Sequence, residues 1–180
     1  MHASFFRTAL ALAAITVGLA GNALGQGMPS HHGFWFSAGL GWGSLGCQGC
    51  SSRTGGTSGN ISLGGTLSDK LLLGVSSNGW VKSENGSTLT VTALTAAVRF
   101  YPSARGGFFL TGGLGLGTVS ANVSGVGSGS ETGVGALLGL GYDIRLGPKV
   151  NLTPYWNGFA MNSSNTDANV GQIGLGITVR

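Results

Sequence analysis

Two cysteines lie three residues apart in the segment Cys47-Gln48-Gly49-Cys50. This spacing suits an intraloop disulfide, a redox dithiol or half of a metal site. A redox dithiol needs a helix start and a βαβ unit, and neither pattern surrounds the pair. A metal site needs two more ligands, and His31 and His32 fall at the opposite rim of the predicted fold. The sequence therefore predicts a disulfide, with no metal and no cofactor.

The rest of the chain contains no convincing sequence motif for catalysis or cofactor binding. The segment Gly41–Gly46 matches G-x-G-x-x-G literally, but no helical pattern follows it, as dinucleotide binding requires. Nucleophilic catalysis of the Ser-His-acid type needs a histidine, and the sequence has none after residue 32. The acids are scattered over separate turns and loops, at Asp69, Glu84, Glu131, Asp143 and Asp167. We therefore expect a protein that is not an enzyme.

Three charged residues fall on the polar face of predicted strands and near the same end of the fold, namely Arg99, Asp143 and Arg145. Buried charges need partners, so we expect these side chains to form an ion-pair cluster in the interior. A structural role is the favoured interpretation, since ion networks commonly fill narrow barrels. A gate or an ion path is the functional alternative.

The element that must position these residues is a β-strand in which apolar and small or polar residues alternate strictly. In Phe34, Phe36, Ala38, Leu40 and Trp42, apolar side chains alternate with glycine and small polar residues. A period of two indicates strand rather than helix, and about ten residues of apolar-out, polar-in alternation suit a lipid-facing barrel. The pattern recurs over the ranges 61–67, 71–81, 94–100, 108–116, 134–144, 150–156 and 173–179. The sequence predicts an all-β fold, an eight-stranded antiparallel up-and-down transmembrane β-barrel.

Local irregularities add finer expectations. Leu89, Val91 and Ala93 alternate out of phase with Leu94 and the residues after it, which predicts a β-bulge near Ala93–Leu94. Pro154 removes one ladder donor, which predicts a bulge or a missing hydrogen bond. Polar segments predict long loops over residues 120–130 and 162–169, with tight turns at the other end. Many inward glycines either leave space for water or a ligand, or allow the sheet to bend.

Composition agrees with a membrane barrel. Only 8% of the 180 residues are charged, against about 25% in typical proteins, while 42% are hydrophobic. The net charge of +4 comes from scattered basic residues, so no nucleic-acid partner is expected. Residues 1–25 have a polar start, an apolar stretch and small residues at the end, which predicts a cleaved secretory signal peptide. Residues 26–32 would form a short N-terminal tether and residues 33–180 the barrel.

The segments 135–146, 151–157, 99–102 and 108–115 together resemble small OmpA-like outer-membrane β-barrel proteins. The resemblance covers essentially the whole mature chain. It implies an eight-stranded barrel in the bacterial outer membrane, partnered by outer-membrane lipid and, during biogenesis, by the outer-membrane assembly machinery. We expect a monomer with a structural or unassigned non-enzymatic role. A narrow pore or small-ligand conduit through a glycine-lined lumen is the alternative.

Overall fold

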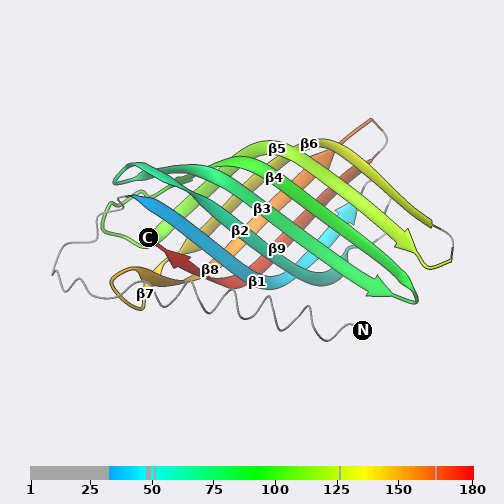
Figure 1. Cartoon of the computed structure of the whole chain (residues 1–180), viewed down its shortest axis with the longest axis horizontal. Coiled ribbons are helices and arrows are strands. Elements are labelled where there is room, and N and C mark those ends of the chain that lie inside the picture. The colour runs from blue at the N-terminus through cyan, green and yellow to red at the C-terminus, as the bar shows by residue number, and fades with distance from the viewer. Residues whose placement is uncertain (1–32, 48–49, 51, 126, 165) are drawn as a thin grey trace.

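The computed structural model describes residues 33–47, 50, 52–125, 127–164 and 166–180 and consists of one closed, strongly tilted sheet (Figure 1). The predicted signal peptide and tether lie outside the described residues. The strands are β1 (Phe34–Cys47), β2 (Thr54–Ser68), β3 (Leu71–Glu84), β4 (Ser87–Phe100), β5 (Phe108–Val123), β6 (Gly127–Tyr142), β7 (Ile144–Arg145), β8 (Val150–Asn162) and β9 (Asp167–Val179).

Each long strand pairs antiparallel with the next long strand in sequence, and β1 pairs with β9 to close the barrel. The short β7 continues β6, because both pair with β8 in one unbroken register. Eight long strands therefore form the wall, and the predicted eight-stranded antiparallel barrel is confirmed. An even strand number brings Phe34 and Val179 to the same end, which we call the terminal end; the opposite end is the loop end.

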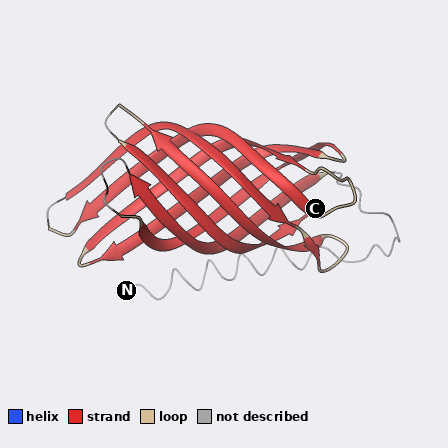
Figure 2. Cartoon of the chain, turned by 180° about the vertical axis from the view of Figure 1, so that it is seen from behind, coloured by secondary structure: helices blue, strands red, loops and turns tan. Residues whose placement is uncertain are grey.

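The described residues form only strands and loops (Figure 2). No helix among them is long and apolar enough to cross a membrane. The alternation of each strand places large apolar side chains on the outside of the wall, with Leu40 75% and Leu114 70% exposed. This surface is the reverse of a soluble protein's exterior and matches a wall that faces lipid.

The predicted bulge near Ala93–Leu94 is wrong. The register of β4 with both β3 and β5 is unbroken, and the shift in the β2–β3 pairing falls between Thr66 and Ser68 instead. Val91 and Ala93 point inward, with exposures of 1% and 2%, whereas Leu94 points outward. The phase change in the sequence therefore reflects an apolar patch inside the barrel and no inserted residue.

Pro154 lies in register with Leu175 of β9, so no bulge forms there. The ladder between β6–β7 and β8 instead stops after the pair Gly141–Tyr155 and resumes at Ile144–Leu152. Proline has no backbone N–H to donate, which accounts for the gap. The second of the two predicted outcomes, a gap in the hydrogen-bonded ladder, is the one observed.

The predicted long loops are largely strand. Strand β5 continues to Val123 and β6 begins at Gly127, so the expected loop over 120–130 shrinks to a three-residue connection. The expected loop over 162–169 shrinks similarly, since β9 begins at Asp167. Polar and glycine-rich residues here extend the barrel beyond its apolar belt, because strand pairing satisfies the backbone whatever the side chains are.

Candidate functional site

The lumen is the first candidate site, and buried side chains occupy it in three layers. The layer nearest the loop end is apolar and centres on Trp80, Val91, Phe159 and Val170, each at most 2% exposed. The Trp80 indole Nε1 donates to the Gly43 carbonyl oxygen at 3.1 Å. This layer was missed by the sequence interpretation, which assigned apolar residues to the lipid face.

The middle layer is polar. Asn78 Oδ1 accepts hydrogen bonds from Asn157 Nδ2 at 3.2 Å and from Gln172 Nε2 at 2.9 Å. Asn78 Nδ2 donates to Ser76 Oγ at 3.1 Å, and Ser76 Oγ lies 2.8 Å from Ser62 Oγ. These five residues come from β2, β3, β8 and β9, so the network joins walls of the barrel that are distant along the sheet.

The third layer holds Arg99 between two aromatic rings. The Arg99 Cζ atom lies 4.6 Å from the Trp35 ring centroid and 4.1 Å from the Phe109 ring centroid. Arg99 is only 6% exposed, and its Nε and Nη1 atoms have no hydrogen-bond partner within the described part of the chain. Cation–π attraction in a desolvated site therefore holds this guanidinium.

Inward glycines make room for these layers. A Cβ at Gly43 would lie 2.7 Å from the Trp80 ring, and one at Gly141 would lie 2.4 Å from the Phe109 ring. A Cβ at Gly174 would lie 2.6 Å from the Tyr155 hydroxyl. The space that the missing side chains leave is thus taken by aromatic residues from other strands.

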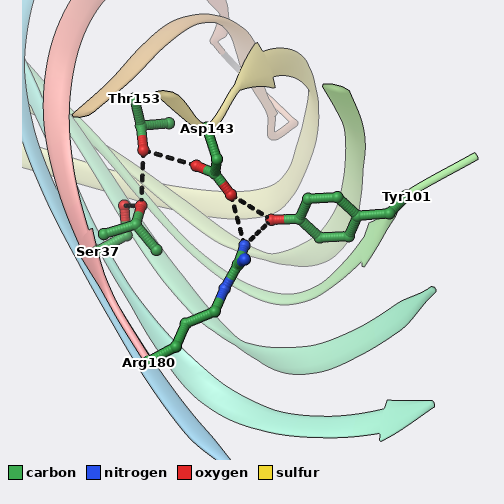
Figure 3. Close-up of polar contacts among 6 residues, drawn as sticks. Ser37, Tyr101, Asp143, Thr153 and Arg180 are labelled. Carbon is green, nitrogen blue, oxygen red and sulfur yellow. Dashed lines mark hydrogen bonds and ion pairs between the residues drawn. The ribbon is translucent and has the colours of Figure 1, made fainter. Parts of the chain in front are cut away.

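At the terminal end, a buried ionic network surrounds Asp143, which occupies the gap between β6 and β7 (Figure 3). Arg180 Nη2 lies 2.5 Å from Asp143 Oδ2, and Tyr101 donates its hydroxyl to the same oxygen at 2.8 Å. Thr153 donates to Asp143 Oδ1 at 2.7 Å. Every contact to this carboxylate therefore comes from a cation or a hydroxyl, as a buried acid requires.

The network continues along a row of hydroxyl groups. Thr153 Oγ1 lies 2.8 Å from Thr178 Oγ1, which lies 2.9 Å from Ser37 Oγ. Tyr101, in the turn that follows β4, also accepts a hydrogen bond from Arg180 (Figure 3). Burial raises the pKa of Tyr101 to about 12, so the phenol keeps its proton and remains a donor at neutral pH.

The predicted cluster of Arg99, Asp143 and Arg145 is corrected by this geometry. Asp143 pairs with Arg180, to which the sequence interpretation assigned no role, and Arg99 lies between aromatic rings. Arg145 is exposed, and its Nε donates to the Gly147 carbonyl oxygen at 3.2 Å. Arg99 and Asp143 are both buried, but partners across the barrel decide which charges meet.

At the loop end, the structure joins the Sγ atoms of Cys47 and Cys50, whose Cα atoms lie 5.3 Å apart. The Cys50 backbone N–H also donates to the Cys47 carbonyl oxygen at 3.2 Å. No group of three or more His, Cys, Asp or Glu residues that could hold a metal occurs in the described ranges.

A family model described as the outer membrane protein beta-barrel domain matches residues 8–180. The chain belongs to this family. Outer membrane beta-barrel domains of this kind reside in the outer membrane of Gram-negative bacteria, so the apolar wall contacts outer-membrane lipid. No curated protein matches the chain.

Solved structures of other outer membrane barrels share the fold of this beta-barrel domain. Neisserial surface protein A is 16% identical, with a TM-score of 0.66, and the match covers 81% of this chain and 96% of that one. Ail of Yersinia pestis, in complex with the heparin analogue sucrose octasulfate, is 16% identical with a TM-score of 0.62, covering 82% and 99%. The N-terminal β-barrel domain of Pseudomonas aeruginosa OprF is 15% identical with a TM-score of 0.50, covering 82% and 98%.

Proposed function

We propose that the chain is a non-enzymatic outer-membrane barrel with a closed, non-conducting lumen, whose role is structural or is exerted by its outer surface. The observation that carries this proposal is the Arg99 guanidinium clamped between Trp35 and Phe109 across the terminal half of the lumen. A planar cation stacked on two buried rings closes the passage and is stabilised by both of them.

Two further layers support a closed lumen. The apolar layer around Trp80 and Phe159 consists mainly of hydrophobic side chains, which compensate an ion poorly for the water it sheds, so entry from the loop end is opposed. An eight-stranded barrel has an interior just wide enough for side chains to fill. The Asn78 network between the two aromatic layers joins the amides of Asn78, Asn157 and Gln172 across the lumen, which supports a filled interior.

The absence of catalysis is part of the same proposal. Asp143 is a buried acid of the barrel, and it is engaged by Arg180, Tyr101 and Thr153. A general base needs a carboxylate that is free to accept a proton from a substrate. We therefore assign Asp143 to stability and expect no cofactor.

Biogenesis completes the proposal. Residues 1–25 act as a cleaved signal peptide, the outer-membrane assembly machinery inserts the barrel, and the folded protein is a monomer in lipid. Cys47 and Cys50 form their disulfide in the oxidising compartment beyond the inner membrane.

The competing function is a narrow pore or small-ligand conduit. Single-channel recording in planar bilayers separates the two, using the refolded protein. We expect no unitary conductance steps from the wild type. Regular steps of reproducible size from the wild type would overturn the closed-lumen proposal and favour the conduit.

Variants sharpen this experiment because the two layers that contain aromatic side chains can be removed separately. Trp80→Ala with Phe159→Ala removes the apolar layer, and Trp35→Ala with Phe109→Ala removes the aromatic clamp around Arg99. Each pair alone should remain silent, since the other layer is intact. All four substitutions together should conduct, which also shows that the assay detects an open barrel. The gel-mobility difference between unheated and heated samples verifies that each variant is folded.

A further inference from the structure

Arg53 lies on the outer wall at the loop end and is fixed there by neutral partners. Its Nε donates to Ser44 Oγ at 2.9 Å, and its Nη1 donates to Asn169 Oδ1 at 2.8 Å. Its Nη2 donates to the backbone oxygens of Ser44 at 2.5 Å and Asn169 at 3.5 Å. These contacts tie β1 to β9, but they leave the positive charge uncompensated by any carboxylate of the described residues.

The nearest acid along β9 does not neutralise Arg53. Asp167 lies two residues before Asn169 and accepts a hydrogen bond from the Asn162 side chain. A guanidinium carries five N–H donors, and the contacts to Ser44 and Asn169 use four of them. One Nη1 donor and the full charge of Arg53 therefore remain available to a ligand.

A groove in the lipid-facing wall begins directly at Arg53. It has a volume of about 580 Å³, and Trp42, Trp156, Gly171 and Ile173 are among the residues that line it. A Cβ at Gly171 would have no neighbour within 4 Å, so this glycine leaves the floor of the groove open. We call this feature the Arg53 groove.

The groove continues toward the terminal end. A second cavity of about 710 Å³ shares Trp156 and Ile173 with it and extends over apolar residues as far as Phe108. The combined feature has a cation at one end and an apolar channel along the rest. That distribution is complementary to an amphiphile with an anionic headgroup and an acyl chain.

We propose that the Arg53 groove binds one lipid that carries an anionic phosphate headgroup. The phosphate pairs with Arg53, and an acyl chain lies over Gly171 and Ile173 between the two tryptophans. Guanidinium and phosphate form charge-assisted hydrogen bonds, which are stronger in the low dielectric beside hydrocarbon than in water. This site depends on the placement of the wall in lipid and is independent of whether the lumen conducts.

The natural fluorescence of the protein reports directly on this site. Trp42 and Trp156 line the groove, whereas Trp35 and Trp80 are buried in the lumen. In vesicles, acyl chains carrying bromine quench tryptophans that they touch, so quenching monitors the groove pair. The probes are brominated phosphatidic acid and brominated phosphatidylcholine, each as a minor component of unlabelled phosphatidylcholine vesicles that hold the full mature protein.

We expect half-maximal quenching at roughly tenfold less phosphatidic acid than phosphatidylcholine, as one charge-assisted contact allows. Arg53→Gln should abolish this preference, and Arg53→Lys, which keeps the charge, should retain part of it. Gly171→Leu should fill the floor and weaken quenching by both lipids. Equal quenching of the wild type by both probes, or an unchanged preference in Arg53→Gln, would overturn the proposal.

Two matched controls isolate the groove. Gly112→Leu changes an outward glycine of β5 that also has nothing within 4 Å, and Arg145→Gln removes an exposed cation at the opposite end. Both should quench like the wild type. Displacement by unlabelled phosphorylated glycolipid more than by unlabelled phosphatidic acid assigns the site to the glycolipid of the outer leaflet, and the reverse order assigns it to a glycerophospholipid. Displacement by neither lipid would overturn the proposal.

Discussion

Arg180 reaches into the terminal end of the barrel and places its Nη2 atom 2.5 Å from Oδ2 of Asp143, which is 3% exposed. Asp143 lies where Pro154 interrupts the ladder between β6–β7 and β8. The Asp143 backbone N–H donates instead to the Gly107 carbonyl oxygen at 2.9 Å. The pair therefore joins the residue that follows the closing strand β9 to the gap in this ladder.

Breaking this pair should be costly. Asp143→Asn leaves Arg180 without its counter-charge, and we expect the free energy of unfolding to fall by about 3 kcal/mol, the low end for one partner of a buried pair. Urea unfolding in lipid vesicles, followed by tryptophan fluorescence, measures the change. Arg145→Gln at the exposed rim is the control, with an effect within about 0.5 kcal/mol. Equal effects of the two substitutions would contradict the assignment.

The Tyr101 phenol predicts a dependence on alkaline pH. Its folded pKa is raised to about 12 by burial, above the unfolded value of about 10. The stability that this shift represents is fully present below pH 10 and is lost as the pH rises through 12, because the unfolded chain releases its proton first. Urea unfolding across this range should show the stability advantage of the wild type over Tyr101→Phe shrinking above pH 10. A constant difference would refute the prediction.

Two alanines of β4 test which face each residue occupies. Ala93 is 2% exposed and points into the lumen, whereas Ala96 is exposed to lipid. Ala93→Leu should destabilise the barrel by about 1–3 kcal/mol through overpacking against the loop-end layer. Ala96→Leu should change the unfolding free energy by less than about 0.5 kcal/mol. Equal tolerance of both substitutions, as expected if a bulge turned both alanines toward lipid, would contradict this assignment.

Two glycines of β5, Gly115 and Gly112, should differ sharply in how well they tolerate substitution by alanine. A Cβ at Gly115 would lie 2.0 Å from the Leu94 carbonyl oxygen, a backbone atom that cannot move without separating β4 from β5. Gly115→Ala should cost about 3 kcal/mol or more, at the upper end for overpacking. Gly112→Ala, on the outer face of β5 with nothing within 4 Å, should fold like the wild type. Folding yield in detergent and urea midpoints report both outcomes.

The alternation of residues such as Phe34–Trp42 was enough to predict an eight-stranded barrel and its membrane setting. A period of two is a local property, because neighbouring side chains must point to opposite faces. The same alternation predicted an inward position for Arg99 and Asp143, which are both buried, whereas Arg145 is exposed at the rim. Strand ends were less predictable, since residues 120–123 and 127–130 of the polar segment pair as strand through their backbones.

Only the tertiary structure decided which side chains contact one another inside the barrel and along its outer wall. From the sequence, the apolar residues Val91 and Ala93 were assigned to the lipid-facing side. In the structure they belong to the buried cluster that also contains Trp80 and Phe159 from other strands. Arg180 meets Asp143, and Arg53 meets Asn169, at sequence separations of 37 and 116 residues. The sequence determined the faces because the pleat is local, whereas closure of the barrel sets every contact across it.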